Sequence, residues 1–374
     1  MIDFLKLPSP CYVLDEELLD RNLAIIDRVR RESGAEIIVA LKACAMWSIF
    51  PELARHSDGA TASSAAEARL VFEEFGRPAH TYAPVYTDRN IEEILRCSDH
   101  ITFNSVAQFE RFGPMALLRG ISCGLRINPQ YSPVETDLYN PCVPGSRLGV
   151  TADLLKELPA GIDGLHFHVL CESRPHHLRL ALEAVEKHFD QYLDRIKWLN
   201  MGGGHLMTHA EYDELIALLR EFKARHPHLR LILEPGSAFT WRTGYLVSTI
   251  EDLVENAGVH TAMLDVSFAC HMPDCLEMPY KPAIVGAHEP AEGEKRWRMG
   301  GTSCLAGDYY GDWAFDHELK VGERIVFEDM IHYTMVKTTM FNGVAHPAIV
   351  IARRDGRIDV VREFGYEDFR NRMS

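Results

Sequence analysis

The sequence predicts an α/β protein, with a (β/α)8 TIM-like barrel followed by a C-terminal domain that is mostly β. Eight short, strand-favouring apolar runs recur over about 200 residues, which is the number that such a barrel requires. Helical patterns separate most of the runs, and strands that alternate with helices indicate a parallel sheet. Beyond residue 241 the runs follow one another without long helices, which predicts the second domain.

The first barrel strand is expected at residues 36–43, "EIIVALKA", where three β-branched side chains suit a strand buried on both faces. Between the strands, residues 64–76 and 210–226 carry apolar side chains at helical spacing. The other seven strands are expected at 59–64, 79–84, 100–105, 123–129, 164–170, 197–204 and 230–236.

The second domain is expected to contain short strands joined by turns. Asp355-Gly356 lies between two alternating runs and predicts a β-hairpin. The early run 11–15 precedes a helical pattern over 15–33 and could pair into this sheet. The C-terminal strands are expected at 245–254, 260–267, 283–287, 323–329 and 348–361.

These patterns predict two domains. The barrel domain is expected at 16–241, and a β-sandwich or β-barrel domain at 242–374. An N-terminal strand within 1–15 is expected to join the second domain.

The composition is typical of a globular protein, with 47% hydrophobic and 25% charged residues and a mean hydropathy of −0.13. No run of about 18 apolar residues is present, so no membrane partner is expected. Residues 1–10 lack the pattern of a signal peptide, and nine cysteines are scattered without a CxxC pair, so a cytoplasmic location is expected. The net charge of −15 disfavours nucleic acid as a partner and favours a cationic substrate, although acidity also aids solubility.

Active sites of (β/α)8 barrels lie at the C-terminal ends of the strands, so residues at those ends are the candidates. They are polar, ionisable or glycine residues that follow apolar runs, as expected for the lining of a site. In chain order they are Lys42, Ser63, Ser64, Asn104, Ser105, Arg126, Asn128, His168, Gly202, Gly203, Gly204 and Glu234.

Four of these features together suit pyridoxal 5'-phosphate. Lys42 offers an amine that can form a Schiff base with an aldehyde. The loop Gly202–Gly204 lets backbone N–H groups approach a phosphate. Glu234 can keep the ring nitrogen protonated, and the flat ring of His168 can lie against the cofactor.

Each feature alone has a plainer interpretation. A lysine at a strand end often extends to the surface, three glycines often form only a turn, and Glu-Pro-Gly can simply end a strand. His166 and His168 could be hydrogen-bonded core histidines or, at this spacing, metal ligands. Their occurrence in order, each at a predicted strand end, favours the cofactor site.

Seven motifs carry a resemblance to a known family. They are "VALKAC", "GLHFHVLCES", "MGGGH", "LEPGSAF", "SFACHMPDCLEMPYKP", "GGTSCLAGDYYGDW" and "HYTMVKTTMFNG". With them the chain resembles the fold-type III pyridoxal-phosphate decarboxylases, whose alanine racemase-like barrel is shared by ornithine and diaminopimelate decarboxylases. The last three motifs resemble the carboxynorspermidine/carboxyspermidine decarboxylases more specifically. The resemblance covers essentially the whole chain.

The resemblance implies a role for each barrel residue. Lys42 resembles the lysine of the Schiff base, His168 the histidine that stacks on the cofactor ring, and Glu234 the partner of the pyridine nitrogen. Arg147 sits where relatives place a basic residue near the cofactor. The glycines that resemble the phosphate loop are Gly202, Gly203 and Gly204.

The resemblance also implies two roles for the second domain. Tyr333 resembles a tyrosine that reaches the phosphate. Cys304 resembles a cysteine that protonates the substrate carbon after carbon dioxide leaves. In this family that cysteine enters the site of the neighbouring subunit, so a homodimer with shared active sites is implied.

Two departures bear on the substrate. Ser237 and Leu305 stand where the ornithine and diaminopimelate enzymes usually have an arginine and an acidic residue. A polyamine tail would instead need carboxylates further out, although ordinary solvated acids are the alternative. The candidates are Asp308, Asp312, Asp274 and Glu277.

A zinc site at "CHMPDC" is the weaker alternative for one of these motifs. Only Cys270, His271 and Cys275 lie close together there, and no second cluster has matching spacing, so no metal is expected.

The expected function is decarboxylation of carboxynorspermidine or carboxyspermidine to norspermidine or spermidine in polyamine biosynthesis. The alternatives are a decarboxylase of diaminopimelate, ornithine or lysine, an amino-acid racemase on the same fold, and a non-catalytic cofactor-binding protein. Such non-catalytic relatives are single barrels, whereas this chain carries a whole second domain with Cys304 and Tyr333.

Overall fold

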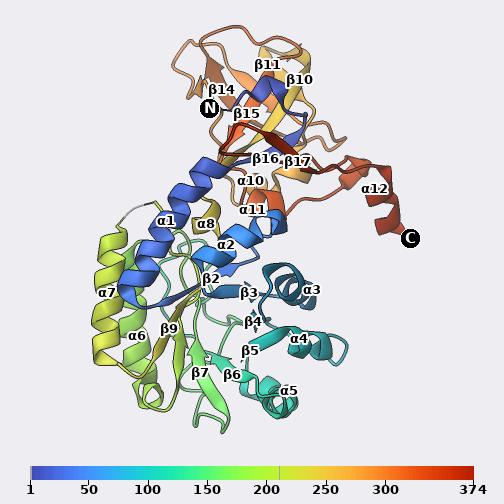
Figure 1. The fold of residues 1–374 in the computed structure, drawn as a ribbon. Coiled ribbons are helices and arrows are strands. Elements are labelled where there is room, and N and C mark those ends of the chain that lie inside the picture. Colours follow the sequence, from blue (N-terminus) through green and yellow to red (C-terminus); the bar gives the residue numbers. More distant parts are fainter. Residues whose placement is uncertain (1, 210) are drawn as a thin grey trace. The chain divides into compact units, whose positions relative to one another are not determined.

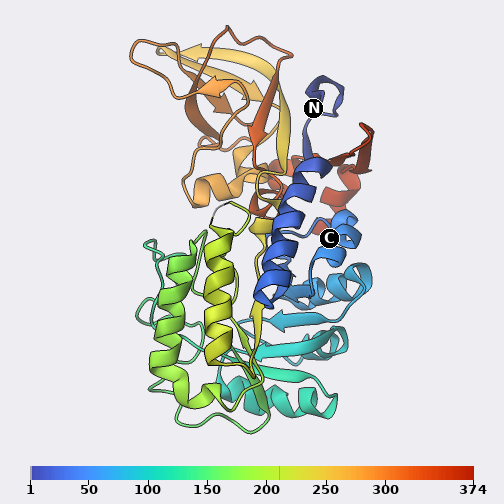
Figure 2. The same ribbon diagram turned by 60° about the vertical axis from the view of Figure 1, so that its left-hand side comes forward.

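The computed structural model describes residues 2–209 and 211–374, and the chain divides into two compact units. One unit spans residues 22–239, and the other combines residues 1–21 with 240–374. Figures 1 and 2 show their helices and strands. The helix α1 (Glu16–Ser33) contributes to both units, so these bounds differ from the expected boundaries at 16 and 241.

The unit 22–239 is a closed barrel in which every neighbouring pair of strands is parallel, so the predicted (β/α)8 barrel is confirmed. Each strand overlaps one of the expected runs. The strands are β2 (Glu36–Ala40), β3 (Gly59–Ala62), β4 (Ala79–Tyr82), β5 (Ser98–Phe103), β6 (Ser122–Arg126), β7 (Ile162–His166), β8 (Trp198–Asn200) and β9 (Arg230–Leu233).

Helices surround the barrel strands (Figure 1). Ser64 and Ser105 begin two of them, because each side chain accepts a hydrogen bond from an N–H of the first turn. The helix expected over 64–76 continues after α3 as a π-helical stretch, and Ala210 of the helix expected over 210–226 lies outside the described residues. The elements are η2 (Trp47–Ile49), α2 (Phe50–His56), α3 (Ala65–Leu70), η3 (Val71–Phe75), α4 (Ile91–Cys97), α5 (Val106–Leu118), α6 (Pro175–Leu193), α7 (Tyr212–Arg225) and α8 (Ser237–Thr240).

Trp198 fills the interior of the barrel together with Ile38 and Ile232. Gly124 and Gly164 make room for it, because a Cβ atom at either position would lie 2.2 or 2.0 Å from the indole ring. Side chains two residues apart on a strand point to the same side. Asn200 and Glu234, which lie two positions after Trp198 and Ile232, therefore form the next layer towards the C-terminal ends of the strands.

The second unit is built on a nine-stranded sheet, so the expected mostly β domain is confirmed. The strand β1 pairs antiparallel with β10 and parallel with β16, which places the N-terminal run inside this sheet. The strands β16 and β17 form the hairpin predicted at Asp355-Gly356. The strands are β1 (Cys11–Asp15), β10 (Gly244–Asn256), β11 (Val259–Leu264), β12 (Ala287–His288), β13 (Trp297–Gly300), β14 (Tyr309–Phe315), β15 (Arg324–Glu328), β16 (Ala348–Ala352) and β17 (Ile358–Arg362).

The sequence pattern misses two of these strands. β13 is only four residues long, and β14 contains Gly311 and Asp312, which both disfavour strands. Of the run 283–287, which the pattern predicts to be a strand, only Ala287 belongs to one. The short helices are η1 (Phe4–Lys6), α9 (Phe268–His271), α10 (Pro273–Glu277), α11 (Tyr333–Val336), η4 (Phe341–Gly343) and α12 (Tyr366–Met373).

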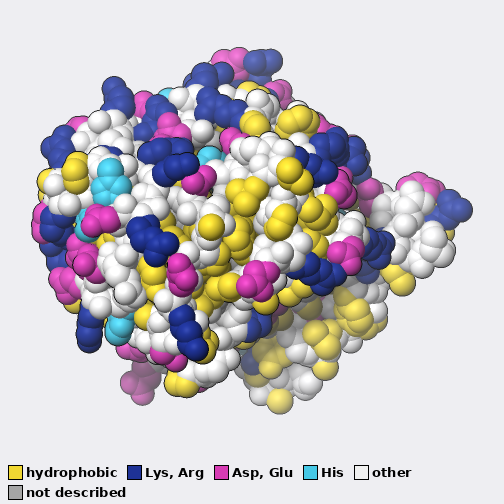
Figure 3. Space-filling view, turned by 90° about the horizontal axis from the view of Figure 1, so that it is seen from below, with side chains coloured by type: hydrophobic (Ala, Val, Ile, Leu, Met, Phe, Trp, Pro, Cys, Tyr) yellow, Lys and Arg dark blue, Asp and Glu magenta, His cyan; other side chains and the backbone are white. Residues whose placement is uncertain are grey.

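Figure 3 shows basic and acidic side chains interspersed on one face, around a hydrophobic area. All nine cysteines are free thiols. Among the helices of residues 2–209 and 211–374, none has the length and apolar character needed to span a membrane.

Candidate active site

Lys42 and His168 meet at the C-terminal end of the barrel strands. Lys42 comes shortly after β2 and His168 shortly after β7, and Lys42 Nζ lies 3.0 Å from His168 Nε2. Burial lowers the pKa of Lys42, an effect that the charge of Glu234 opposes. Burial and the neighbouring Lys42 hold the pKa of His168 well below its usual value. Both shifts act against the charged forms of these two groups.

A backbone hydrogen bond fixes the tautomer of His168. The Gly203 N–H donates to His168 Nδ1 at 2.9 Å. Because an accepting Nδ1 carries no proton, neutral His168 carries its proton on Nε2. That proton faces Lys42 Nζ, which can accept it only as a neutral amine. A neutral amine is the nucleophilic form that attacks an aldehyde.

Glu234 is held as a carboxylate just after β9. Asn200 Nδ2 donates to Glu234 Oε1 at 2.7 Å, and His166 Nε2 lies 3.6 Å from Oε2. Burial alone would raise the pKa of Glu234, but His166 and then the Asn200 hydrogen bond lower it to about 2, and a charge on Lys42 would act in the same direction. Burial lowers the pKa of His166. Glu234 is thus the charged member of this cluster at neutral pH.

The glycine loop brings the ends of three strands close together. A Cβ atom at Gly203 would lie 2.3 Å from the Glu234 carbonyl oxygen. At Gly204, where φ is +88°, it would lie 2.2 Å from the Leu170 carbonyl oxygen. The amides of Gly202 and Gly203 donate to Asn200 and His168 respectively. These glycines permit the close approach, and their part in phosphate binding stays a prediction.

Arg126 supports the site from β6. It is buried, its guanidinium lies 4.7 Å from the centre of the Tyr82 ring, and its Nη2 donates to the His168 carbonyl oxygen at 3.2 Å. Arg126 thereby fixes the backbone of the residue that contacts Lys42. Arg147, the predicted basic neighbour of the cofactor, is exposed, and its carbonyl oxygen accepts from Asn104 Nδ2 at 2.8 Å.

In the second unit, Asp308 fastens the loop that carries Cys304. Its carboxylate accepts hydrogen bonds from the N–H and hydroxyl of Ser303 and from the N–H of Ala269, at 3.0, 2.6 and 3.0 Å. Cys304 is exposed, and its N–H donates to Asn342 Oδ1 at 2.8 Å. Asp308 is therefore engaged by its own loop.

The other predicted residues of this unit lie on or near its short helices. Tyr333 is half-buried at the start of α11. Asp312 Oδ1 lies 3.9 Å from Arg298 Nε, and Glu277 forms an ion pair with Lys337.

Asp274 is buried like Asp308 but differs from the other candidate acids in one carboxylate oxygen. It is buried, and its Oδ2 accepts hydrogen bonds from Tyr280 and Thr334 at 2.6 and 2.8 Å. Its Oδ1 has no hydrogen-bond partner among the described residues. Within those residues, Cys270, His271 and Cys275 do not gather into a group with metal-ligand spacing.

The donor set at the barrel end fits pyridoxal 5'-phosphate. Lys42 provides a neutral amine for the aldehyde, and Glu234 provides an ionised partner for a protonated ring nitrogen. The sequence reasoning did not identify Asn200, which orients Glu234. The available signal was a polar residue at the end of a buried strand, immediately before the glycine loop.

Comparison with known proteins agrees with this chemistry. The family described as "Pyridoxal-dependent decarboxylase, C-terminal sheet domain" matches residues 11–331. A carboxyaminopropylagmatine decarboxylase of Synechocystis sp. is 56% identical over 371 residues, which cover 98% of this chain and 96% of that protein. A carboxynorspermidine/carboxyspermidine decarboxylase of Campylobacter jejuni is 38% identical over 378 residues, covering 97% of this chain and 98% of that protein.

A solved structure supports the same assignment. Carboxynorspermidine decarboxylase from Campylobacter jejuni, complexed with norspermidine, superposes with a TM-score of 0.90 at 35% identity, covering 98% of this chain and all of that one. The resemblance inferred from the sequence motifs is thus confirmed. The chain is an enzyme that belongs to the pyridoxal-dependent decarboxylases, and pyridoxal 5'-phosphate is its cofactor.

Proposed function

We propose that this enzyme decarboxylates a carboxylated polyamine, taking the carboxyl group from an aminopropyl end and leaving a primary amine. The observation that carries the reaction type is the ionised Glu234 at the same barrel end as the Lys42 amine. The substrate class rests on the similarity to enzymes named for carboxyaminopropylagmatine and carboxynorspermidine/carboxyspermidine. The higher identity of the first makes carboxyaminopropylagmatine the leading substrate, with carboxynorspermidine and carboxyspermidine as the other candidates.

When bound, pyridoxal 5'-phosphate supplies an electron sink that accepts the electron pair left as carbon dioxide departs. Lys42 offers its amine to the aldehyde, and Glu234 holds the proton on the ring nitrogen. His168, which donates through Nε2, orients the Lys42 amine. The bond between the α-carbon and the carboxylate breaks, and a proton takes the place of the carboxylate. We assign that proton to Cys304, following the family resemblance.

We infer that Asp274 receives a cationic nitrogen of the substrate tail. Its Oδ1 retains acceptor capacity, whereas Asp308 is engaged by its own loop and Glu277 is paired with Lys337. An Asp274→Asn variant should raise KM for polyamine substrates much more than for ornithine, which lacks the long tail. Asp312→Asn is the matched control, because that carboxylate is half-exposed beside Arg298. Equal effects of Asp274→Asn on both substrates would contradict this role.

We also infer a homodimer in the cytoplasm, acting in polyamine biosynthesis. The dimer rests on the family resemblance at Cys304, and the location on nine free thiols, which suit a reducing compartment. Sedimentation of the loaded enzyme measures the assembly directly, and a monomer at working concentration would reject the dimer.

A substrate panel tests the function. Carbon dioxide release should be measured on carboxyaminopropylagmatine, carboxynorspermidine, carboxyspermidine, diaminopimelate, ornithine and lysine. We expect the highest kcat/KM on a carboxylated polyamine. A preference for diaminopimelate, ornithine or lysine would overturn the proposal, and inversion of an amino acid without carbon dioxide release would indicate a racemase.

A further inference from the structure

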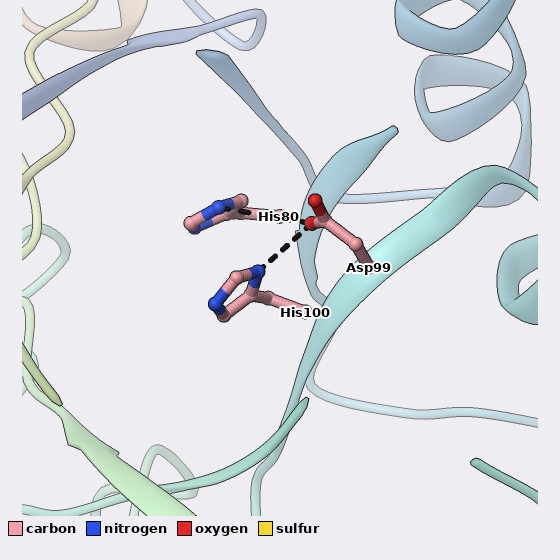
Figure 4. A group of neighbouring side chains, drawn as sticks. All are labelled: His80, Asp99 and His100. Atoms are coloured by element: carbon pink, nitrogen blue, oxygen red, sulfur yellow. Dashed lines mark hydrogen bonds and ion pairs between the residues drawn. The ribbon is translucent and has the colours of Figure 1, made fainter. Parts of the chain in front are cut away.

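We propose that His80, Asp99 and His100 bind one zinc ion at the N-terminal end of the barrel (Figure 4). His80 lies near the start of β4, and Asp99 and His100 lie near the start of β5. Among residues 2–209 and 211–374, these are the three His, Cys, Asp or Glu side chains whose ligand atoms lie close enough together to hold one metal ion.

A β-bulge brings the three side chains together. The register between β4 and β5 passes from Ala79↔Ser98 to His80↔His100, so Asp99 is an extra residue without a partner. Successive side chains on a regular strand point to opposite faces, and a bulge re-aims one of them. Here the irregularity lets Asp99 turn its carboxylate towards both imidazoles, as Figure 4 shows.

The distances suit a zinc ion once the two imidazole rings rotate out of their stacked arrangement. Asp99 Oδ1 lies 2.8 Å from His100 Nδ1 and 3.8 Å from His80 Nε2. Tetrahedral zinc with bonds of about 2.0–2.2 Å separates its ligand atoms by about 3.3–3.6 Å, which lies between these two distances. The rings now stack at 3.9 Å between centroids with 24° between planes. Because a bound imidazole holds the ion in its ring plane, binding should open this stack.

The donor types favour zinc over hard cations. Two imidazole nitrogens and one carboxylate form a set typical of zinc, whereas magnesium and calcium prefer oxygen ligands alone. Three protein ligands leave the fourth position to water. His100 Nε2 is buried and has no hydrogen-bond partner among the described residues, so Nδ1 is the nitrogen that its surroundings direct towards Asp99.

The surroundings of the three residues can accept a cation, and the exposed side of Asp99 gives it a path of entry. Arg230 pairs with Glu36 through two hydrogen bonds of 2.7 Å, so its charge is offset mainly by Glu36 and only secondarily by Asp99. The Asp99 side chain is 50% exposed, while His80 and His100 are each 13% exposed. An ion can therefore enter past Asp99 and reach two largely buried imidazoles.

This site is separate from the decarboxylation site. His80 and Asp99 lie at the N-terminal ends of their strands, whereas Lys42 and Glu234 lie beyond the C-terminal ends of theirs. Trp198, whose ring lies 5.7 Å from that of His100, belongs to the apolar layer of the barrel interior. Zinc here would hold β4 and β5 together rather than join the chemistry.

The test uses the cofactor-loaded enzyme after removal of metal by a chelator. Calorimetric titration with zinc should show one binding event per chain at this site. Zinc binding that is the same in the unaltered enzyme and in the variants below belongs to other sites. His80→Ala and His100→Ala should each lower the zinc affinity of this site. Loss of a residue that only supports a ligand costs roughly 10- to 100-fold in metal affinity, so loss of the ligand itself should cost at least that much. His226→Ala, which removes a similarly buried histidine paired with Glu186, should leave it unchanged. Decarboxylase activity should be retained in all three variants.

A spectroscopic measurement on the unaltered enzyme covers the case in which a variant does not fold. Cobalt substituted for zinc should give ligand-field bands of a tetrahedral site, and X-ray absorption of the zinc form should show imidazole and oxygen ligands. Absence of the binding event, wild-type affinity in both His80→Ala and His100→Ala, or thiolate ligands would overturn the proposal.

Discussion

Asn200 joins Glu234 to the glycine loop. Its Nδ2 donates to Glu234 Oε1 at 2.7 Å while its Oδ1 accepts from the Gly202 N–H at 2.9 Å. The side chain is buried, so both hydrogen bonds are protected from water. One amide thus sets the direction of the carboxylate and the position of the loop.

Replacing Asn200 with aspartate should impair catalysis more than cofactor binding. Asn200→Asp removes the donor and places a second carboxylate beside Glu234, which raises the pKa of Glu234. We expect kcat to fall by about two orders of magnitude, the usual effect of losing one oriented donor at a reacting group. Infrared titration of the carboxylates should show the raised pKa. Asn22→Asp, at a buried asparagine that donates to the Phe239 carbonyl oxygen, is the control.

Removing the Lys42 amine should abolish the attachment of the cofactor. Lys42→Ala should lose the absorbance band at about 420 nm that a lysine-bound cofactor gives. Lys197→Ala, at an exposed lysine paired with Asp163, should keep the band. An unchanged spectrum in Lys42→Ala would remove Lys42 from the role assigned to it.

The stability of the enzyme should depend on Glu234 in acid. The pKa of Glu234 is lowered from 4.5 to about 2 in the folded protein, so its contribution is present above pH 4.5 and is lost as the pH falls towards 2. The full contribution amounts to about 3 kcal/mol. Urea unfolding at pH 6 and pH 3 should show a smaller loss of stability for Glu234→Gln than for the unaltered enzyme. Equal losses would contradict the low pKa.

Mixing two inactive variants should restore part of the activity if sites are shared between subunits. Lys42→Ala lacks the amine and Cys304→Ala lacks the proposed proton donor, so a mixed dimer would contain one complete site. Denaturing and refolding the variants together, followed by carbon dioxide assay, measures this rescue. Variants refolded separately and then combined provide the baseline, and no gain over it would argue against a shared site.

Gly203 should not tolerate a side chain. Gly203→Ala places Cβ 2.3 Å from the Glu234 carbonyl oxygen, so the loop must shift. We expect a loss of roughly 1–3 kcal/mol in unfolding free energy and weaker cofactor binding. At Gly59 the nearest atom to a Cβ is a side-chain carbon at 3.5 Å, so Gly59→Ala should have little effect. Denaturant unfolding and cofactor titration of both variants provide the comparison.

The sequence alone determined the barrel and the position of its reactive groups. Each strand is an apolar run of limited length, and the residue that ends such a run has to lie at the barrel end. The sequence therefore places Lys42, His168 and Glu234 at one end of the barrel. The strands β13 and β14 could not be predicted from the sequence, because short or glycine-containing strands show no clear alternation of apolar and polar residues.

Only the tertiary structure decided which side chains meet. Asn200 ends a short buried strand, and nothing in that pattern reveals that its amide turns to Glu234. His80 and Asp99 are 19 positions apart in the chain, and a bulge in the register between β4 and β5 brings their side chains together. Local patterns specify strands, because burial acts on each residue in turn. Hydrogen-bond partners depend on the pairing register of the strands and on the closure of the barrel. Both are set by all eight strands together and not by any local pattern.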